Sequence, residues 1–332
     1  ATPSTPATRP DLDGWSLEEA EFVVEANVEG NLDLFLVRGR DDTAWIRLTD
    51  GPGRDARARW APDGSWIVFE SDRVSEAEPA RRHLLRLDLP PGGAPSGGDP
   101  ASLALPSGTP LVASGGYGEG ASVSPDGTRI AFRSTRSAGG RDAVGAFRGF
   151  AGREGVGHLW TVAIGDSVAE AVRVTREPVP DGTVPAWHPS GRDLFYARQR
   201  AGDGPAPILL VSLDGIRERA VVSDGRVHDT PLPSPDGALI AWTTRVLDSD
   251  TVEVRIADLD GGNARELVRG RYRLTDWTPD GAYLVADLID GERAEPVLLP
   301  VTGGAVEPLL RSAAPASGAV FRPPPRIPTR GG

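Results

Sequence analysis

Short apolar runs alternate with turn residues along most of the chain, at the spacing of short β-strands. Each repeat contains a Pro-Asp-Gly-type turn, which a tryptophan precedes by two positions in three of the copies. An apolar run follows the turn in each complete copy. Proline removes a backbone donor at the strand end and glycine supplies the positive φ of a tight turn. The pattern therefore predicts two antiparallel strands at each motif proline, namely Pro62, Pro125, Pro189, Pro235, Pro279 and Pro323.

The spacing of these turns predicts the architecture. Consecutive motif prolines are 63, 64, 46, 44 and 44 residues apart. Each interval also holds an alternating third strand, such as residues 84–87, 158–162, 208–211 or 252–256, and a weaker fourth strand, such as 172–175 or 265–268. A period in the forties with one such turn per unit is typical of the four-stranded blades of a β-propeller.

The order of strands predicts how the ring closes. The chain begins with a second strand (22–24), a third (32–37) and a fourth (44–48), and it ends with a lone first strand (318–321). Five complete blades lie between, and the sixth is shared by both ends, which removes exposed sheet edges. The prediction is an all-β, six-bladed β-propeller of four-stranded antiparallel blades over residues 17–323, with Pro-rich tails at 1–16 and 324–332.

The repeat resembles that of the TolB-type propellers, which are related to the WD-repeat propellers. The hallmark is Trp-Ser-Pro-Asp-Gly followed by Ile-Ala-Phe-x-Ser-Asp-Arg, and several copies of it follow one another in register here. Tryptophan is missing at Val123, Pro233 and Phe321, and Ser190 replaces the aspartate. The resemblance implies the fold and an exported protein, in the periplasm or at the cell surface. Propellers serve binding, scaffolding and catalysis alike, so the fold leaves the function open.

Composition narrows the function classes. The net charge is −11 and the pI is near 5.0, which argues against a nucleic-acid partner. The absence of cysteine excludes disulfides, thiolate-zinc sites, a cysteine nucleophile and a cysteine-linked lipid anchor within this sequence. The absence of methionine suggests a removed targeting segment or a trimmed initiator. No apolar stretch approaches the roughly 20 residues of a membrane span, so we expect no transmembrane segment in this chain.

Two insertions indicate a surface for a protein partner. Residues 106–119 and 137–156 connect strands on the face opposite the Pro-Asp-Gly turns, and long loops on a rigid scaffold usually carry binding. The candidate partner surface consists of Tyr117, Phe147, Arg148 and Phe150. The alternative is that the phenylalanines cap the core of the adjacent blade.

Counting six residues back from each motif proline indicates the mouth of the central channel. The candidate mouth residues are Glu119, Asp181, His228, Asp229 and Arg273. Carboxylates and an imidazole around one opening could bind a cation or polar ligand; the alternative is a solvated polar ring. Residues 258–263 resemble part of a calcium loop, but their place between two strands predicts a hairpin turn. We therefore predict no metal and no cofactor.

Two functional hypotheses follow. No Gly-x-Ser-x-Gly or His-Glu-x-x-His motif is present, and we assign no catalytic residue. The favoured hypothesis is a noncatalytic protein-binding propeller of the cell envelope, acting as an adaptor, scaffold or accessory subunit of a larger assembly, including a membrane-protein complex. The alternative is a lyase or hydrolase acting on a glycan or peptide at the channel mouth. A cluster of Glu119, His228, Asp229 and Arg273 within hydrogen-bonding reach, together with a deep pocket, would favour it.

Overall fold

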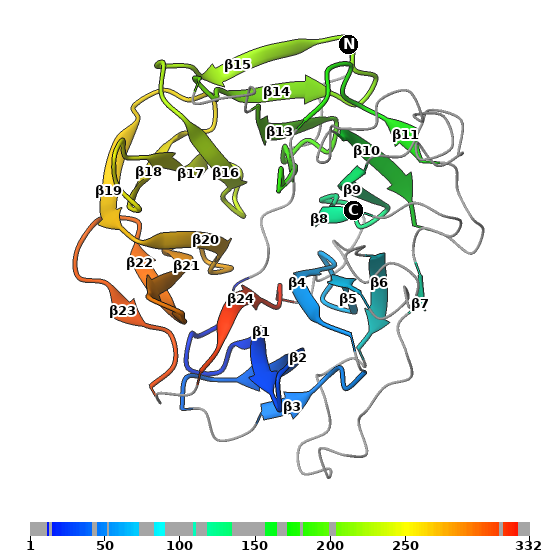
Figure 1. The fold of residues 1–332 in the computed structure, drawn as a ribbon, viewed down its shortest axis with the longest axis vertical. Coiled ribbons are helices and arrows are strands. Elements are labelled where there is room, and N and C mark those ends of the chain that lie inside the picture. Colours follow the sequence, from blue (N-terminus) through cyan, green and yellow to red (C-terminus); the bar gives the residue numbers. More distant parts are fainter. Residues whose placement is uncertain are drawn as a thin grey trace, which may run out of the picture.

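In the computed structural model, six four-stranded antiparallel sheets stand around a central axis (Figure 1). The structure describes residue 12 and residues 15–41, 45–51, 53–72, 83–89, 109–110, 118–134, 157–164, 171–179, 182–198, 204–311 and 315–324. Within each sheet the strands follow one another in chain order, except in the sheet that combines both ends of the chain. The predicted six-bladed β-propeller is confirmed.

The blades are numbered from the sheet that contains both ends. Blade 1 comprises β24 (Ser317–Phe321), β1 (Glu21–Val28), β2 (Asn31–Arg38) and β3 (Trp45–Arg47). Blade 2 comprises β4 (Asp55–Trp60), β5 (Trp66–Ser71), β6 (His83–Asp88) and β7 (Thr109–Pro110). Blade 3 comprises β8 (Glu119–Val123), β9 (Arg129–Ser134), β10 (His158–Ala163) and β11 (Val172–Arg173).

The remaining three blades follow in the same order. Blade 4 comprises β12 (Ala186–Trp187), β13 (Asp193–Ala197), β14 (Ile208–Ser212) and β15 (Glu218–Val222). Blade 5 comprises β16 (His228–Pro233), β17 (Leu239–Arg245), β18 (Val252–Asp258) and β19 (Arg265–Gly270). Blade 6 comprises β20 (Tyr272–Trp277), β21 (Tyr283–Asp290), β22 (Arg293–Pro300) and β23 (Glu307–Pro308). In the described part of the chain, no helix is long and apolar enough to span a membrane.

The ring closes through the C-terminal strand. β24 lies beside β1, and Phe22 is opposite Phe321 while Val23 is opposite Val320. Because β1 is followed by β2 and β3, the last strand completes a sheet that the first three strands began. The predicted closure is confirmed.

The Pro-Asp-Gly segments form the tight turns between first and second strands. Gly64 has a φ of 68°, and the Asp63 carboxylate accepts the Ser65 N–H over 3.0 Å. In blade 4, where serine replaces aspartate, Ser190 Oγ accepts the Arg192 N–H over a longer 3.4 Å. A side-chain acceptor two residues before the donor is what these turns require, which explains why serine is tolerated there.

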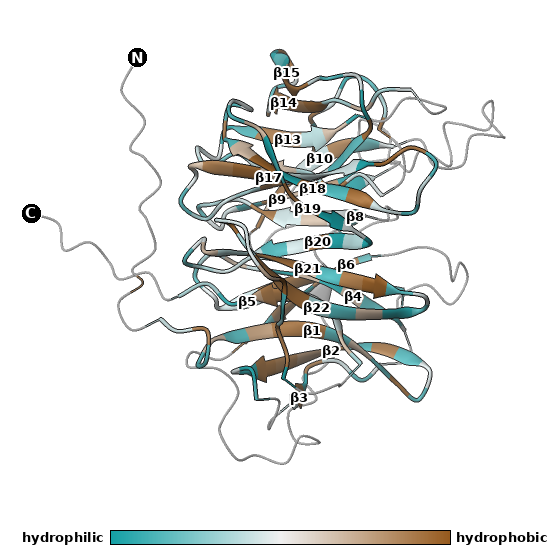
Figure 2. Cartoon of the chain, turned by 90° about the vertical axis from the view of Figure 1, so that its left-hand side faces the viewer, coloured by the Kyte–Doolittle hydropathy of each residue, from teal (hydrophilic) through white to brown (hydrophobic). Residues whose placement is uncertain are grey.

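Hydrophobic side chains fill the layers between neighbouring blades. One cluster joins Val23 and Leu34 of blade 1 to Phe69 and Leu85 of blade 2. Seen from the side, hydrophobic residues lie mainly along the strands of the ring (Figure 2). Each blade therefore buries its apolar residues against its neighbours, and the ring must be complete for all of them to be covered.

The repeat tryptophans also join the blades. The indole N–H groups of Trp60, Trp187 and Trp277 donate to backbone carbonyls of the preceding blade, over 3.0 to 3.2 Å. They belong to blades 2, 4 and 6. Blades 3, 5 and 1 have Val123, Pro233 and Phe321 at that position, so the departures from the repeat alternate around the ring.

Most first strands contain a β-bulge near their middle. The register shifts in the pairings of β24, β4, β8, β16 and β20 with their neighbours. In four of these bulges one residue, five positions before the motif proline, has a positive φ: Gly318, Arg57, Gly120 and Thr230. At Gly120 a Cβ would lie 2.8 Å from the Thr183 carbonyl oxygen, so glycine permits close approach of the next blade.

Candidate functional site

Acidic side chains at one position of the repeat hold the blades together. Glu25, Glu70 and Asp287 end the apolar run of the second strand in blades 1, 2 and 6, and all three are buried. Each accepts a backbone N–H from the bulge of the next blade. Glu25 binds the Arg57 N–H and Glu70 binds the Gly120 N–H, both over 2.7 Å.

The third of these bonds lies at the ring closure. The Gly318 N–H lies 2.9 and 3.1 Å from the two carboxylate oxygens of Asp287. A β-bulge leaves an N–H outside the ladder, and a buried N–H without an acceptor is unfavourable. These carboxylates therefore satisfy bulge donors across blade boundaries.

Two of the predicted mouth residues form separate ion pairs. Arg273 Nη2 lies 2.6 Å from Asp287 Oδ2, and its side chain is 53% exposed. Glu119 Oε1 lies 2.6 Å from Nη1 of the fully buried Arg133, and it also accepts the Gly182 N–H over 3.3 Å. Burial raises the pKa of Asp287, and the neighbouring Arg273 lowers it in part.

His228 and Asp229 form hydrogen bonds with residues other than the predicted mouth residues. His228 is fully buried; its Nε2 lies 2.8 Å from Asp224 Oδ1, and its Nδ1 lies 2.9 Å from Thr244 Oγ1. Burial lowers the pKa of this imidazole, while Asp224 acts in the opposite direction. Asp229 accepts the Thr230 N–H over 2.7 Å, and burial raises its pKa.

The predicted mouth residues thus do not form one cluster. Among the described residues, none of Glu119, His228, Asp229 and Arg273 is hydrogen-bonded or ion-paired to another of the four. Asp181 lies outside the described residues, as do Tyr117, Phe147, Arg148 and Phe150. No group of three or more His, Asp and Glu side chains in the described part of the chain could hold a metal ion.

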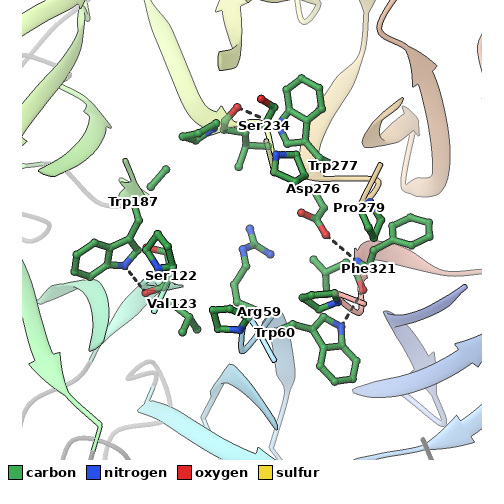
Figure 3. A pocket seen from close by; sticks show the side chains of 18 of the residues that line it. Arg59, Trp60, Ser122, Val123, Trp187, Ser234, Asp276, Trp277, Pro279 and Phe321 are labelled. Atoms are coloured by element: carbon green, nitrogen blue, oxygen red, sulfur yellow. Dashed lines mark hydrogen bonds between the residues drawn. The ribbon is translucent and has the colours of Figure 1, made fainter. Parts of the chain in front are cut away.

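The other end of the channel, beside the Pro-Asp-Gly turns, contains a cavity of about 330 Å³. Figure 3 shows this end cavity, with the residues of the first strands around it. Three tryptophans and the six motif prolines line it, namely Trp60, Trp187, Trp277, Pro62, Pro125, Pro189, Pro235, Pro279 and Pro323. The hydrogen bonds of the indoles to neighbouring blades hold these walls in place.

Arg59, Ser122 and Asp276 are among the polar residues that line the end cavity. Figure 3 shows the Arg59 and Asp276 side chains pointing into the cavity from different blades. Asp276 Oδ2 accepts the Phe321 N–H over 2.8 Å. We did not single out these three residues from the sequence. Each member stands three residues before a motif proline, so counting three positions back would have found it.

Burial affects both ionisable groups of the end cavity. It raises the pKa of Asp276 to about 6, although Arg59 and two backbone N–H groups lower it in part. It lowers the pKa of Arg59, which nearby carboxylates, Asp276 first among them, raise in part. Arginine remains protonated at neutral pH, so the cavity combines a fixed positive charge with a carboxyl group that titrates near neutrality.

Six four-stranded blades closed through a shared sheet define a six-bladed β-propeller. No family model matches the chain. An uncharacterised protein of Agrobacterium fabrum (strain C58) is 23% identical over 306 residues, which cover 73% of this chain and 96% of that protein.

Two solved structures extend the comparison. TolB from Acinetobacter baumannii superposes with a TM-score of 0.66 at 16% identity, covering 93% of this chain and 68% of that chain. An oligogalacturonate lyase in complex with manganese superposes with a TM-score of 0.57 at 16% identity, covering 90% of this chain and 76% of that chain. The resemblance to the TolB-type propellers is confirmed for the fold, which a lyase also shares.

Proposed function

We propose that this chain is a protein-binding propeller of the cell envelope, which serves as an adaptor or an accessory, stabilising subunit of a larger assembly. The carboxylate bonds between neighbouring blades carry the proposal. Glu25, Glu70 and Asp287 are used to join blades, so the polar channel groups build a rigid ring. A rigid ring suits the presentation of loops to a partner. The fold shared with TolB is consistent with this role.

The proposed docking surface lies on the face opposite the Pro-Asp-Gly turns. The insertions 106–119 and 137–156 include the connections from β7 to β8 and from β9 to β10, and these strand ends lie on that face. Aromatic and arginine side chains dominate the energetics of many interfaces. We therefore propose Tyr117, Phe147, Arg148 and Phe150 as the contact residues. All four lie outside the described residues.

The double variant Phe147→Ala/Phe150→Ala tests the docking surface. If the loop binds a partner, the variant should weaken complex formation by about 2–4 kcal/mol, the range of interface hot spots, with little change in stability. Recovery of the co-purified assembly from the native envelope and thermal unfolding measure the two effects side by side. Ile216→Ala is the matched control, because Ile216 is 67% exposed in the turn between β14 and β15, on the opposite face.

A structural role of the phenylalanines would give the reverse result. If they cap a blade core, the double variant should lose about 3–5 kcal/mol of folding free energy, as other large-to-small core substitutions do. That loss together with unchanged partner recovery would contradict the docking surface. The proposed envelope location is tested separately by cell fractionation of the native protein, and recovery in the cytosol alone would contradict it.

The alternative is a lyase or hydrolase acting on a glycan or peptide at the channel mouth. The structural similarity to the oligogalacturonate lyase favours it at the level of the fold. However, the residues that it requires are held by separate partners. Turnover of a glycan or peptide substrate that is lost when Glu119, His228 and Asp229 are replaced together would favour this enzyme over the adaptor.

A further inference from the structure

We propose that the end cavity binds a small dipolar ligand, an amino acid or short peptide whose carboxylate contacts Arg59 and whose ammonium group contacts Asp276. This site is distinct from the docking surface proposed above, because it lies at the Pro-Asp-Gly end of the channel. It depends on described residues alone.

Arg59 provides the positive end of the proposed site. Its one hydrogen bond within the described structure runs from Nη1 to the Ala58 carbonyl oxygen, over 2.8 Å. A guanidinium has five N–H donors, and no described carboxylate lies within ion-pairing distance of this one. A largely buried cation without a contacting anion is unfavourable. A ligand carboxylate would supply the missing partner in a bidentate geometry.

Three other arginines on first and second strands show the contrast. Arg57 Nη1 lies 3.4 Å from Glu70, while Arg133 pairs with Glu119 and Arg273 pairs with Asp287, both over 2.6 Å. Each of these cations has a carboxylate partner within the protein. Arg59 differs because its position, three residues before the motif proline, turns it toward the end cavity.

Asp276 provides the negative end. Its Oδ2 is fixed by the Phe321 N–H, and its carboxyl group points into the cavity that Arg59 enters (Figure 3). β4 and β20, which carry the two residues, belong to blades 2 and 6 and flank β24 of blade 1. Asp276 and Arg59 influence each other electrostatically without direct contact. The two groups present opposite charges to the same cavity.

The rest of the wall limits the size and polarity of the ligand. At the equivalent position the other three blades carry Val320, Ala186 and Leu232, and blade 3 carries Ser122. The Ser122 hydroxyl is buried without a hydrogen-bond partner in the described structure. A volume of about 330 Å³ is at the lower end of ligand sites, which favours an amino acid or short peptide.

Charge balance selects the dipolar class. A simple anion would pair with Arg59 but face the Asp276 carboxylate, and a simple cation would meet the reverse problem. A zwitterion satisfies both groups, and unmatched charge is penalised strongly in an enclosed site. Proline rings and indoles would contact the apolar part of the ligand.

Three matched probes test the proposal. Alanyl-proline carries both charges, its N-acetyl derivative carries the anion alone, and its C-terminal amide carries the cation alone. Isothermal titration calorimetry near pH 7 should show binding of alanyl-proline, with each capped probe weaker by about ten- to hundredfold, since each loses one charged hydrogen-bonded contact.

Two isosteric variants identify the contacts. Arg59→Gln should weaken alanyl-proline and the N-acetyl probe by about ten- to hundredfold, whereas Asp276→Asn should weaken alanyl-proline and the amide similarly. Arg217→Gln removes the same charge from an exposed turn and should bind like the parent. Thermal unfolding confirms that each variant is folded.

The same titrations can contradict the proposal. Absence of binding by all three probes at millimolar concentration would overturn it, as would equal binding of the charged and capped probes. Unchanged affinity in Arg59→Gln would also overturn it. None of these three results affects partner recovery at the opposite face. Failure of the ligand site is therefore distinguishable from failure of the docking role.

Discussion

At the scale of single residues, the carboxylate that ends a second strand acts across a blade boundary. The bulge in the next first strand turns a backbone N–H out of the ladder, at Arg57, Gly120 or Gly318. An ionised acceptor forms a stronger hydrogen bond than a neutral one. These bonds join blades at points where the sheets themselves share no strand pairing.

Glu70 offers a direct test of these inter-blade bonds. Glu70→Ala leaves the buried Gly120 N–H without its acceptor, and we expect the free energy of unfolding to fall by about 1–3 kcal/mol. Glu70→Gln keeps an acceptor and should lose less. Urea denaturation of both variants measures the difference. Glu292→Ala, at an exposed position in the turn between β21 and β22, should stay within about 0.5 kcal/mol of the parent.

If Glu70→Ala were no more destabilised than Glu292→Ala, the carboxylate would not be a stabilising link between blades 2 and 3. A fall in stability equal for the Ala and Gln variants would instead assign the effect to the lost charge beside Arg57.

Asp276 should make stability depend on pH. Burial raises its pKa in the folded protein to about 6, whereas an aspartate in an unfolded chain titrates near 4. The folded state therefore binds this proton more tightly, and the contribution to stability falls as pH rises through that window. Asparagine mimics the protonated carboxyl group. We expect Asp276→Asn to raise the free energy of unfolding on the order of 2 kcal/mol near pH 7, with the gain vanishing near pH 4.

Chemical denaturation of parent and variant at both pH values gives the comparison, because the other titrating groups cancel in the difference. A gain of equal size at both pH values would show that ionisation of Asp276 is not its source.

At the scale of elements, β24 is the strand on which closure depends. It pairs with β1, and Ala319, Val320 and Phe321 are buried in clusters shared with neighbouring blades. The Trp60 indole and the Thr275 hydroxyl donate to its carbonyls. Blades 1, 2 and 6 therefore all use this one strand.

Deleting residues 318–332 should abolish cooperative folding or cause strong aggregation. The deletion exposes the edge of β1 and uncovers the apolar residues that β24 covers. Thermal unfolding and light scattering measure the outcome, and deletion of residues 325–332, which keeps β24, is the control. A thermal transition of the longer deletion that matched the parent would contradict closure through β24.

At the scale of the whole molecule, the two ends of the channel differ in chemistry. The mouth contains ion pairs that the protein satisfies itself, such as Arg273 with Asp287 and Arg133 with Glu119. The Pro-Asp-Gly end is lined by proline and tryptophan and holds Arg59 without a paired carboxylate in the described structure. The docking surface and the ligand site that we propose therefore lie at opposite ends of one ring.

The sequence by itself determined the architecture. Strand order, blade number and closure follow from a pattern that repeats locally, with Pro-Asp-Gly turns and apolar runs in each unit. The turn forms even where the repeat differs from Pro-Asp-Gly, because Ser190 still provides a side-chain acceptor. Short-range turn chemistry and period-two burial carry this information, and both act within a few residues.

Only the tertiary structure decided which polar groups meet. The bulges shift the alternation of the first strands, so the count of six residues before each motif proline did not find the side chains that share the end cavity. His228, predicted at the mouth, is buried beside Asp224 and Thr244. Arg59 and Asp276, which the sequence analysis did not single out, face the same cavity from blades on either side of the closure. Their approach depends on the curvature of the whole ring, which brings together residues from distant repeats, and no local pattern records it.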